Sequence, residues 1–414
     1  MSAALSSLGI LLIIGAPVAF ALAIGGFAYL WSTDTALSTL ASHLFSTLNS
    51  ATIMTIPFFI LAADILSRCG ATRDLVALVT RVVGGDRGMI PVVAVLSCTF
   101  FAAICGSSTA TAAAIGVVLI PEMIRHGYDK KFAVGLIATA GGLGMLIPPS
   151  IPLIIYGLVT ETSISKLFQA AMGPGLFLAA LLCAIGYIVG RRMAPVAVSD
   201  ANVSSAVDAG VPARAYPLIA LPFIVLGGIY FGFFTPIEAS AVSVVYALAI
   251  AVLIYRTSWR GLADMLSAAA ATSSIILLIL AGAALVGYAM TAERIPHHVF
   301  NWISSFDVSS MTLLFALAGC LLLVGMMLEV LSIILIAMPI LLPLLLSNQI
   351  DVVMFAVLLI VNMELAVITP PIGLNLFVIS SISGVKVHDV FIGTLPFALT
   401  LLAFLGVLIL WFGF

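Results

Sequence analysis

Residues 145–157 read MLIPPSIPLIIYG and place two adjacent prolines, Pro148 and Pro149, inside an apolar stretch long enough to cross a bilayer. Proline removes a backbone donor and breaks the hydrogen-bond ladder of a helix. In hydrocarbon, irregular backbone is tolerated only where protein or a water-filled cavity surrounds it. The stretch therefore predicts a membrane helix over 132–159 that is broken near mid-depth, with protein or water around the break.

The composition places the rest of the chain in a lipid bilayer as well. Of the 414 residues, 63% are hydrophobic and 8% are charged, with a mean hydropathy of +1.31. A soluble domain is about 25% charged. The net charge of −2 offers no basic surface for nucleic acid, and the five cysteines occur singly without a metal-binding CxxC pair. We therefore expect an all-α polytopic membrane protein with no nucleic-acid partner and no cofactor.

The doubled proline recurs in residues 368–380, ITPPIGLNLFVIS, inside a second predicted broken helix over 352–380. The two sites are 222 positions apart. Three pairs of landmarks share this offset: Pro148 and Pro370, Pro121 and Pro343, and Asp129 and Asp351. The coincidence predicts two structural repeats, whereas a single Pro-Pro pair would more simply indicate a kinked helix.

A hairpin precedes each predicted broken helix. The first covers 89–126 and turns at GSSTAT, residues 106–111, and the second covers 311–346 and turns at GMMLE, residues 325–329. Arms of about 16 residues are marginal for a full crossing, so re-entrant hairpins and pairs of short spans both remain open. The small and hydroxyl residues of the first turn fit either a tip that faces an ion or a close helix contact.

A polar stretch at 194–213 divides the chain and predicts a cytoplasmic linker between a first repeat, 1–193, and a second, 214–414. With the N-terminus cytoplasmic and each hairpin returning to its own side, 13 of the 15 lysines and arginines lie inside, as the positive-inside rule favours. The two repeats are then inverted. Inverted repeats with broken helices are typical of secondary transporters, and half-helix ends at mid-depth can bind ions and anions.

Acidic residues in apolar segments are the next candidates, because a charge near the bilayer centre is costly and usually functional. Glu364 lies six residues before Pro370, in the helix that leads to the second break, and Glu329 lies at the turn of the second hairpin. Both are candidates for electrostatic tuning of an ion or substrate site, with a neutral structural carboxyl as the alternative. Asp64, before SRCG, is expected at the membrane surface.

These motifs resemble those of one transporter family. The runs GSSTATAAAIGVVLIPEMIRHGYD (106–129), GGLGMLIPPSIPLIIYG (141–157) and GMMLEVLSIILIAMPILLP (325–343), together with ITPPIGLNLFV and GFFTPIEASAV, closely resemble the large membrane subunit of the TRAP (tripartite ATP-independent periplasmic) transporters. The resemblance covers essentially the whole chain. It implies an elevator-type carrier in the bacterial inner membrane, driven by a sodium gradient, that imports an organic acid such as a carboxylate.

The resemblance also implies partners and sites. A periplasmic substrate-binding protein would deliver substrate, and because the chain begins at its first span, the small four-span membrane subunit is expected as a separate chain. Sodium ions would be the only metal ions. The first sodium site would comprise Ser107, Ser108, Thr109, Pro148 and Ser150. The second would comprise Gly325, Thr369, Pro370, Gly373 and Asn375, with Glu329 and Glu364 nearby. Substrate would bind between the two hairpin tips.

The expected mechanism has a transport domain, made of the hairpins and broken helices, that slides against a scaffold made of the remaining spans. One alternative is a stand-alone proton- or sodium-coupled organic anion carrier of related fold, in which Glu329 or Glu364 would carry the proton. A membrane enzyme would need His, Asp or Glu residues clustered at one membrane face, and the sequence has no such cluster. We therefore expect a transporter and no catalytic residues.

Overall fold

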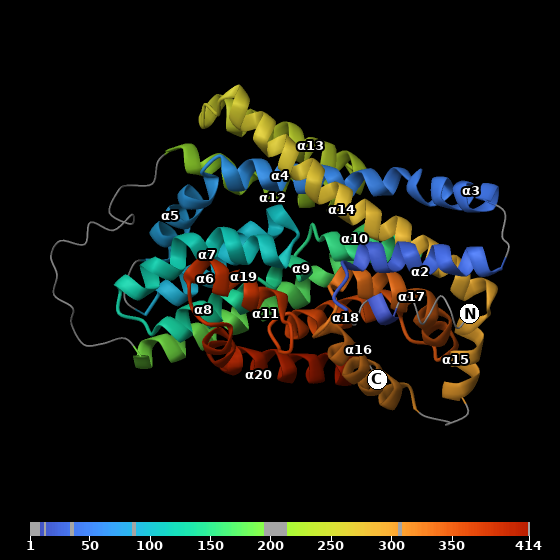
Figure 1. Cartoon of the computed structure of the whole chain (residues 1–414). Coiled ribbons are helices and arrows are strands. Elements are labelled where there is room, and N and C mark those ends of the chain that lie inside the picture. The colour runs from blue at the N-terminus through green and yellow to red at the C-terminus, as the bar shows by residue number, and fades with distance from the viewer. Residues whose placement is uncertain are drawn as a thin grey trace.

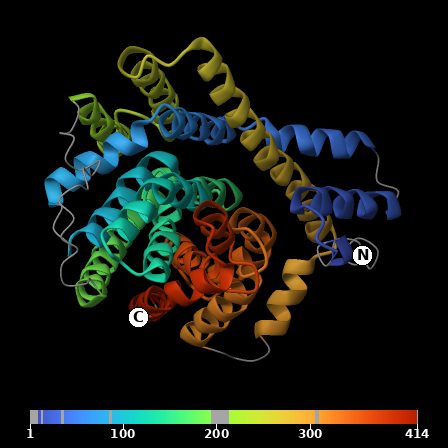
Figure 2. The ribbon, with the colours of Figure 1, turned by 60° about the vertical axis from the view of Figure 1, so that its left-hand side comes forward.

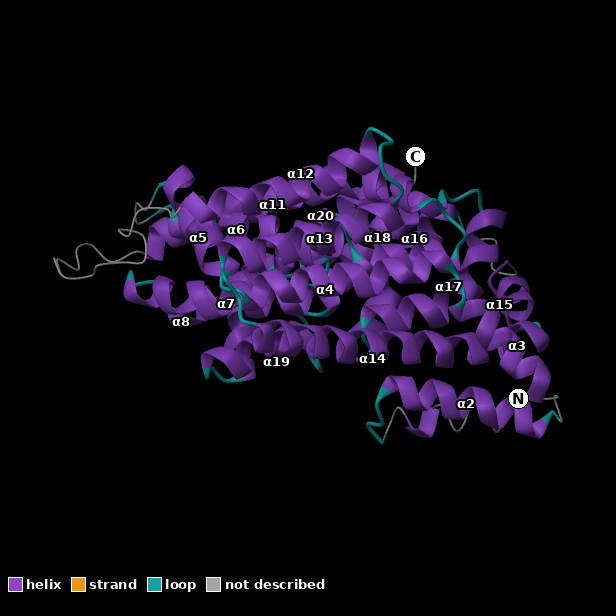
Figure 3. Cartoon of the chain, turned by 90° about the horizontal axis from the view of Figure 1, so that it is seen from above, coloured by secondary structure: helices purple, strands orange, loops and turns teal. Residues whose placement is uncertain are grey.

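The computed structural model describes residues 9–11, 14–33, 37–84, 88–193, 213–304 and 309–412. Every regular element in these ranges is a helix, which confirms the predicted all-α class (Figure 3). Within them, nine helical segments are long and apolar enough to cross a membrane. Met1, and all of the predicted linker except its last residue, lie outside the described residues.

The first doubled proline interrupts a helical segment that spans Lys130–Val159. Residues 147–150 are not helical, and all four are buried. The hairpin before the segment turns at Gly106 and Ser107. The helices concerned are α6 (Ile90–Cys105), α7 (Ser108–Arg125), α8 (Lys130–Ala140), α9 (Leu143–Leu146) and α10 (Ile151–Val159).

The second half repeats this order of elements with one fewer short helix. A hairpin turns at residues 326–329, and residues 367–373 interrupt the helical segment that follows. Both doubled prolines, Pro148–Pro149 and Pro370–Pro371, have a cis peptide bond. The helices concerned are α16 (Ser310–Gly325), α17 (Val330–Ser347), α18 (Val352–Ala366) and α19 (Leu374–Ser383).

Local capping explains why aspartate recurs at the offset of 222. The Asp129 carboxylate accepts hydrogen bonds from two backbone N–H groups at the start of α8, at 3.1 and 3.3 Å. The Asp351 carboxylate does the same for α18, at 2.7 and 3.1 Å. Aspartate is a preferred N-cap because it satisfies donors that the first turn leaves free. Asp129 and Asp351 therefore mark where each broken helix begins.

A group of six helices covers one side of the hairpins and broken helices. In Figures 1 and 2 the blue and olive ribbons of this group form a layer over the teal, orange and red ones. The longest member, α14, packs against α2, α3 and α4, and α13 packs against α4 and α12. The six are α2 (Val18–Ser32), α3 (Leu37–Leu48), α4 (Thr55–Arg68), α12 (Tyr216–Tyr230), α13 (Pro236–Ala249) and α14 (Trp259–Ala292). The remaining short elements around them are η1 (Ala51–Met54), η2 (Ala213–Ala215) and η3 (Ile250–Ile254), with α15 (Ile295–Ser304) between α14 and α16.

Two further spans, α11 (Ile164–Met193) and α20 (Val387–Phe412), pack against the broken helices. The backbones of α8 and α20 touch where Gly135 faces Gly393: a Cβ on Gly393 would lie 1.9 Å from the Lys131 carbonyl oxygen. The Lys131 Nζ also pairs with an Asp389 carboxylate oxygen at 2.9 Å. Helices α11 and α20 thus pack against the hairpins and broken helices.

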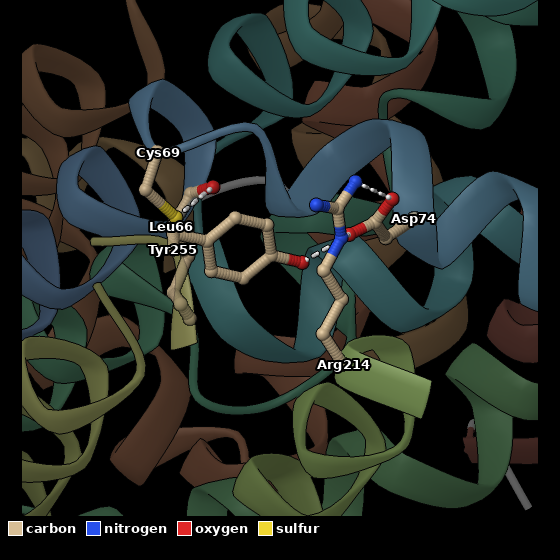
Figure 4. A network of polar contacts seen from close by, with 5 residues as sticks. All are labelled: Leu66, Cys69, Asp74, Arg214 and Tyr255. Atoms are coloured by element: carbon tan, nitrogen blue, oxygen red, sulfur yellow. Dashed lines mark hydrogen bonds and ion pairs between the residues drawn. The ribbon is translucent and has the colours of Figure 1, made fainter. Parts of the chain in front are cut away.

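Helix α5 (Ala71–Val83) contacts both groups, because it packs against α6 and α7 on one side and near α4, η2 and α12 on the other. Its buried Asp74 accepts two hydrogen bonds from Arg214, at 2.7 and 3.3 Å, and one from the Tyr255 hydroxyl at 2.6 Å (Figure 4). Burial and this bond to Asp74 raise the pKa of Tyr255, which keeps the hydroxyl protonated as a donor. The cluster joins α5 to the two ends of the α12–α13 hairpin.

Candidate functional site

A cavity of about 430 Å³ lies between the turns of the two hairpins, here called the tips, and the layer of six helices described above, here called the covering layer. Its walls come from α4 and α14 on one side and from both tips and both breaks on the other. From the tips and breaks, the lining includes Gly106, Ser107, Ser108, Thr109, Ile151, Glu329, Val330 and Leu374. From the covering layer it includes Ile60, Ala63, Asp64, Thr272, Ile275, Ile276 and Ile279. The cavity thus lies between the two tips, where the sequence analysis expects the substrate.

Four helices begin at this cavity. The lining contains the first residue of α7, of α10, of α17 and of α19: Ser108, Ile151, Val330 and Leu374. The first N–H groups of a helix have no partner within it, and the N-terminus carries about half a positive charge. The four N-termini therefore place positive partial charges at the cavity wall, where no lysine or arginine of the described residues lies.

The first tip is fitted tightly to the first break. The Ile151 N–H, just after the break, donates to the Gly106 carbonyl at 3.2 Å. Gly106 has a positive φ of 64°, and a Cβ there would lie 2.6 Å from the Pro149 carbonyl oxygen. Ser150 donates from its hydroxyl to the Met145 carbonyl and accepts from the backbone N–H of the third residue of α10. These contacts give the backbone groups freed by the prolines new partners.

Three predicted ion-binding residues lie together at this tip. The hydroxyls of Ser107 and Thr109 are 3.4 Å apart, and Ser107 is the N-terminal cap residue of α7. Ser108 is buried. A Cβ on Gly144 would lie 2.5 Å from the Ser107 carbonyl oxygen, so the short helix α9 presses directly on the tip. The structure therefore brings the predicted first-site residues Ser107, Ser108 and Thr109 next to the segment that holds Pro148 and Ser150.

The second tip meets the second break in a similar way. The Ile372 N–H donates to the Met326 carbonyl at 3.1 Å, which parallels the bond between Ile151 and Gly106. Gly325 is buried against α18, where a Cβ would lie 2.8 Å from that of Ala366. The Thr369 hydroxyl donates to the Leu365 carbonyl at 2.6 Å. Gly373, at φ 60°, is the residue from which α19 begins.

Asn375 follows the second break, but its side chain reaches the first tip. Its amide nitrogen donates to the Ser108 hydroxyl at 2.7 Å and to the Ala138 carbonyl at 2.8 Å, so it contacts the first tip and the first broken helix. The residue is fully buried, and its Oδ1 has no hydrogen-bond partner among the described residues. The structure thus places Asn375 with the first group of predicted ligands, although its sequence position suggested the second.

Glu364 lies in the same region. Its side chain is 2% exposed, and its Oε1 has no hydrogen-bond partner among the described residues. A Cβ on Gly142, in the bend between α8 and α9, would lie 3.4 Å from the Glu364 Cγ. Gly142 is one helical turn beyond Ala138, to which Asn375 is bonded. Two side chains from the second half, each with an unpaired buried oxygen, therefore lie against one short stretch of the first.

Only acidic side chains carry formal charge in the cavity wall. Glu329 and Asp64 line the cavity, and among the described lining residues there is no lysine or arginine. Asp64 lies on the α4 face that turns toward the cavity, together with Ile60 and Ala63. Side chains at i, i+3 and i+4 share one face of a helix, so the sequence spacing could have indicated this.

The sequence analysis also missed two polar side chains that are fully buried in the second half. Asn362 donates to the Ala318 carbonyl at 2.9 Å while its Oδ1 is unpaired, and the Ser332 hydroxyl of α17 has no partner among the described residues. The signal was present: each is a polar residue inside an otherwise apolar run. Hydroxyl, amide and carboxylate oxygens of this kind suit a hard cation such as sodium.

Comparisons with known proteins agree with this architecture. The family model described as "Tripartite ATP-independent periplasmic transporter, DctM component" matches residues 5–414. The C4-dicarboxylate TRAP transporter large permease protein DctM of Pseudomonas aeruginosa is 37% identical over 377 residues, which cover 91% of this chain and 88% of that protein. The relatives are therefore transporter permeases and match along nearly their whole length.

Other relatives carry different substrate names. The 2,3-diketo-L-gulonate TRAP transporter large permease protein YiaN of Escherichia coli is 34% identical and covers 96% of this chain and 93% of its own. The sialic acid TRAP transporter large permease protein SiaM of Vibrio cholerae is 30% identical, with 93% and 90% covered. Relatives of similar identity are thus named for different substrates.

Two solved transporter structures share the fold at low sequence identity. The Alcanivorax borkumensis YdaH transporter superposes with a TM-score of 0.68 at 16% identity, covering 91% of this chain and 88% of that one. Neisseria gonorrhoeae MtrF gives 0.67 at 14% identity, covering 92% and 85%. The family match along the whole chain and the permease relatives confirm the resemblance seen in the sequence motifs: this multi-pass membrane protein belongs to the DctM component family of the tripartite ATP-independent periplasmic transporters.

Proposed function

We propose that the chain imports an organic acid across the bacterial inner membrane, driven by sodium, with its N-terminus in the cytoplasm. The observation that carries the proposal is the cavity at which α7, α10, α17 and α19 all begin. Four helix N-termini attract an anion, and neighbouring oxygens can hold the cations that accompany it. Relatives named for C4-dicarboxylate, 2,3-diketo-L-gulonate and sialic acid support an organic acid as the substrate class.

The first sodium site in this proposal lies where the first tip meets the first break. Ser107, Ser108 and Thr109 would bind with groups of the segment around Pro148 and Ser150, and the unpaired Oδ1 of Asn375 would join them. Hydroxyl and amide oxygens suit sodium. Sodium would bind the amide oxygen of Asn375, and the amide nitrogen would keep its hydrogen bonds to Ser108 and Ala138.

The second sodium site would use the second tip and break, around Gly325, Thr369, Pro370 and Gly373. The buried, unpaired oxygens of Asn362 and Ser332 lie on the helices that flank this region and support a cation there. Glu364 and Glu329 would contribute negative charge from nearby. A bound cation removes the cost of leaving a carboxylate in hydrocarbon.

Substrate would bind in the cavity between sodium-organised tips and the face of α4 and α14. Since no described lining residue is lysine or arginine, the helix N-termini and the sodium ions would balance the substrate's charge. Sodium and substrate would therefore stabilise each other's binding, which is the condition for coupling. The acids Glu329 and Asp64 would disfavour an anion in the absence of sodium.

The proposed motion is an elevator. The hairpins and broken helices, with α11 and α20 packed on them, would move as one body past α2, α3, α4, α12, α13 and α14. A small four-span membrane subunit would pack against this scaffold, and a periplasmic binding protein would deliver substrate. The relative named isethionate TRAP transporter permease protein DctMQ supports such a partner, because this chain spans only 62% of its length.

The test is uptake into proteoliposomes that contain the chain with its small subunit. The substrate would be one that the cognate binding protein retains, and each reaction would run with and without that protein and an inward sodium gradient. We expect uptake only when both are present. Uptake that ignores sodium and follows a pH gradient would contradict the proposal.

One observation favours a proton-coupled, stand-alone carrier as the second candidate: the buried Glu364 has an unpaired oxygen that could carry a proton. In that case Glu364→Gln and Glu329→Gln together would abolish coupling to the pH gradient, and uptake would not need the binding protein. If the double variant keeps sodium-driven uptake, the proton-coupled alternative is excluded.

A further inference from the structure

A second cavity, of about 300 Å³, lies far from the hairpin tips, between α5 and the opposite end of the first hairpin. Helix α5 contributes Arg73, Val76, Ala77 and Thr80, which the spacing i, i+3, i+4 and i+7 places on one face. The first hairpin contributes Ile90, Val93, Val117, Val118, Leu119, Pro121, Glu122, Arg125 and His126. None of these residues lines the cavity between the tips.

The hairpin wall of this cavity is basic at one end and apolar further along α7. Arg125 and His126 lie at the end of α7, next to the start of α6 at Ile90, whereas Val117 lies eight residues back along α7. Eight residues of helix span about 12 Å. The two basic groups therefore lie at the end of a candidate membrane-spanning helix, Ser108–Arg125, and the valine and leucine side chains lie further along it. This is the profile of a phospholipid, with a charged headgroup over an apolar chain.

The charges of the cavity favour an anion at its surface end. Glu122 is buried and already pairs within α7: its carboxylate lies 3.5 Å from the Arg125 guanidinium and 3.4 Å from the His126 ring. Arg73 is exposed and forms no ion pair with a described residue. With histidine neutral, two arginines and one glutamate leave one net positive charge.

Contacts of the neighbouring residue anchor helix α5. Asp74, the next residue, is held by Arg214 and Tyr255 from the α12–α13 hairpin (Figure 4). Helix α5 is thereby anchored to the covering layer, and Arg73 is turned to the hairpin side. The anchor supplies one side of a preformed cleft, and the first hairpin supplies the other.

We propose that this cleft binds one anionic phospholipid, with the phosphate between Arg73 and Arg125 and an acyl chain along Val76, Ala77 and Val117. Basic pockets between membrane helices commonly hold such headgroups. A free organic phosphate shares the headgroup chemistry but would leave the apolar wall unused. The bound lipid bridges α5 and the first hairpin.

Native mass spectrometry of the purified full chain in detergent micelles tests this site. The probes are phosphatidylglycerol, phosphatidylcholine with the same acyl chains, and soluble glycerol phosphate. The variants are Arg73→Ala, Arg125→Ala and the cavity-filling Ala77→Phe. The matched control is Arg81→Ala, which removes an exposed arginine of the same helix that does not line the cleft. A thermal melt of each variant confirms that it is folded.

We expect one phosphatidylglycerol to remain bound to the parent chain and to Arg81→Ala, with about fivefold weaker binding for each cleft arginine removed. Ala77→Phe should lose phosphatidylglycerol while every charge is retained. Equal binding of phosphatidylcholine, binding of glycerol phosphate alone, or equal loss in Arg81→Ala would each overturn the proposal.

Discussion

At the scale of single residues, Asn375 follows the second break but forms its side-chain hydrogen bonds with the first half of the chain. One amide nitrogen uses both of its hydrogens, on the Ser108 hydroxyl and the Ala138 carbonyl, and so links the two halves of the chain. The amide oxygen remains buried and unpaired. An unpaired buried oxygen costs about 1–3 kcal/mol, and a cation at the proposed first sodium site would remove this cost.

Replacing Asn375 should therefore impair sodium binding more than folding. We expect Asn375→Ala to raise the sodium concentration for half-maximal uptake at least about tenfold, since a buried hydrogen-bonding group that meets a charge is worth about 1.5–3 kcal/mol. Asn348→Ala, which alters an asparagine at the end of α17, is the matched control and should be silent. Normal sodium dependence in Asn375→Ala would show that the amide only holds the two halves together.

The Asp74 cluster gives a prediction about stability alone. Tyr255→Phe removes one donor from a buried carboxylate that keeps its two bonds to Arg214, and we expect it to lower the free energy of unfolding by about 1.5 kcal/mol. Tyr187→Phe, which removes an exposed bond to Arg191, should change it by less than about 0.5 kcal/mol. Denaturant titration in detergent micelles measures both, and equal effects would contradict the assigned role of the cluster.

At the scale of elements, the sequence predicted what is encoded locally. The hairpins and both breaks were found because small residues, prolines and capping aspartates act within a few positions of themselves. The partners of Asn375 are 267 and 237 positions away, and no local pattern specifies them. The same holds for α11 and α20, whose apolar faces indicate burial but not against which neighbour.

The contact of α8 with α20 provides the test at this scale. A Cβ at Gly393 would overlap the Lys131 carbonyl of α8, whereas nothing lies within 4 Å of a Cβ at Gly406 in the same helix α20. We expect Gly393→Ala to destabilise the protein by about 1–3 kcal/mol and Gly406→Ala to be neutral or slightly stabilising. Thermal unfolding followed by size-exclusion chromatography compares them. If both alanines behave alike, α8 and α20 do not form one rigid unit.

At the scale of the whole molecule, the cavity is lined by two packed groups of helices instead of by either one alone. Figure 2 shows these groups as a layer of blue and olive ribbons beside the teal, orange and red ones. One wall belongs to the tips and breaks, and the other to α4 and α14. Motion of the first group past the second would carry the tips, their ions and the substrate together while α4 and α14 stay in place. Both membrane faces would then gain access to the same tip residues in turn.

Accessibility of Ala110, an exposed cavity-lining residue of α7 that is not a proposed sodium ligand, tests this claim most directly. In a chain whose native cysteines are replaced, Ala110→Cys would be labelled with a membrane-impermeant maleimide from each side of sealed vesicles, with and without sodium. We expect labelling from both sides, with sodium changing the ratio between them because it favours one arrangement. Labelling from only one side under every condition would contradict alternating access at this cavity.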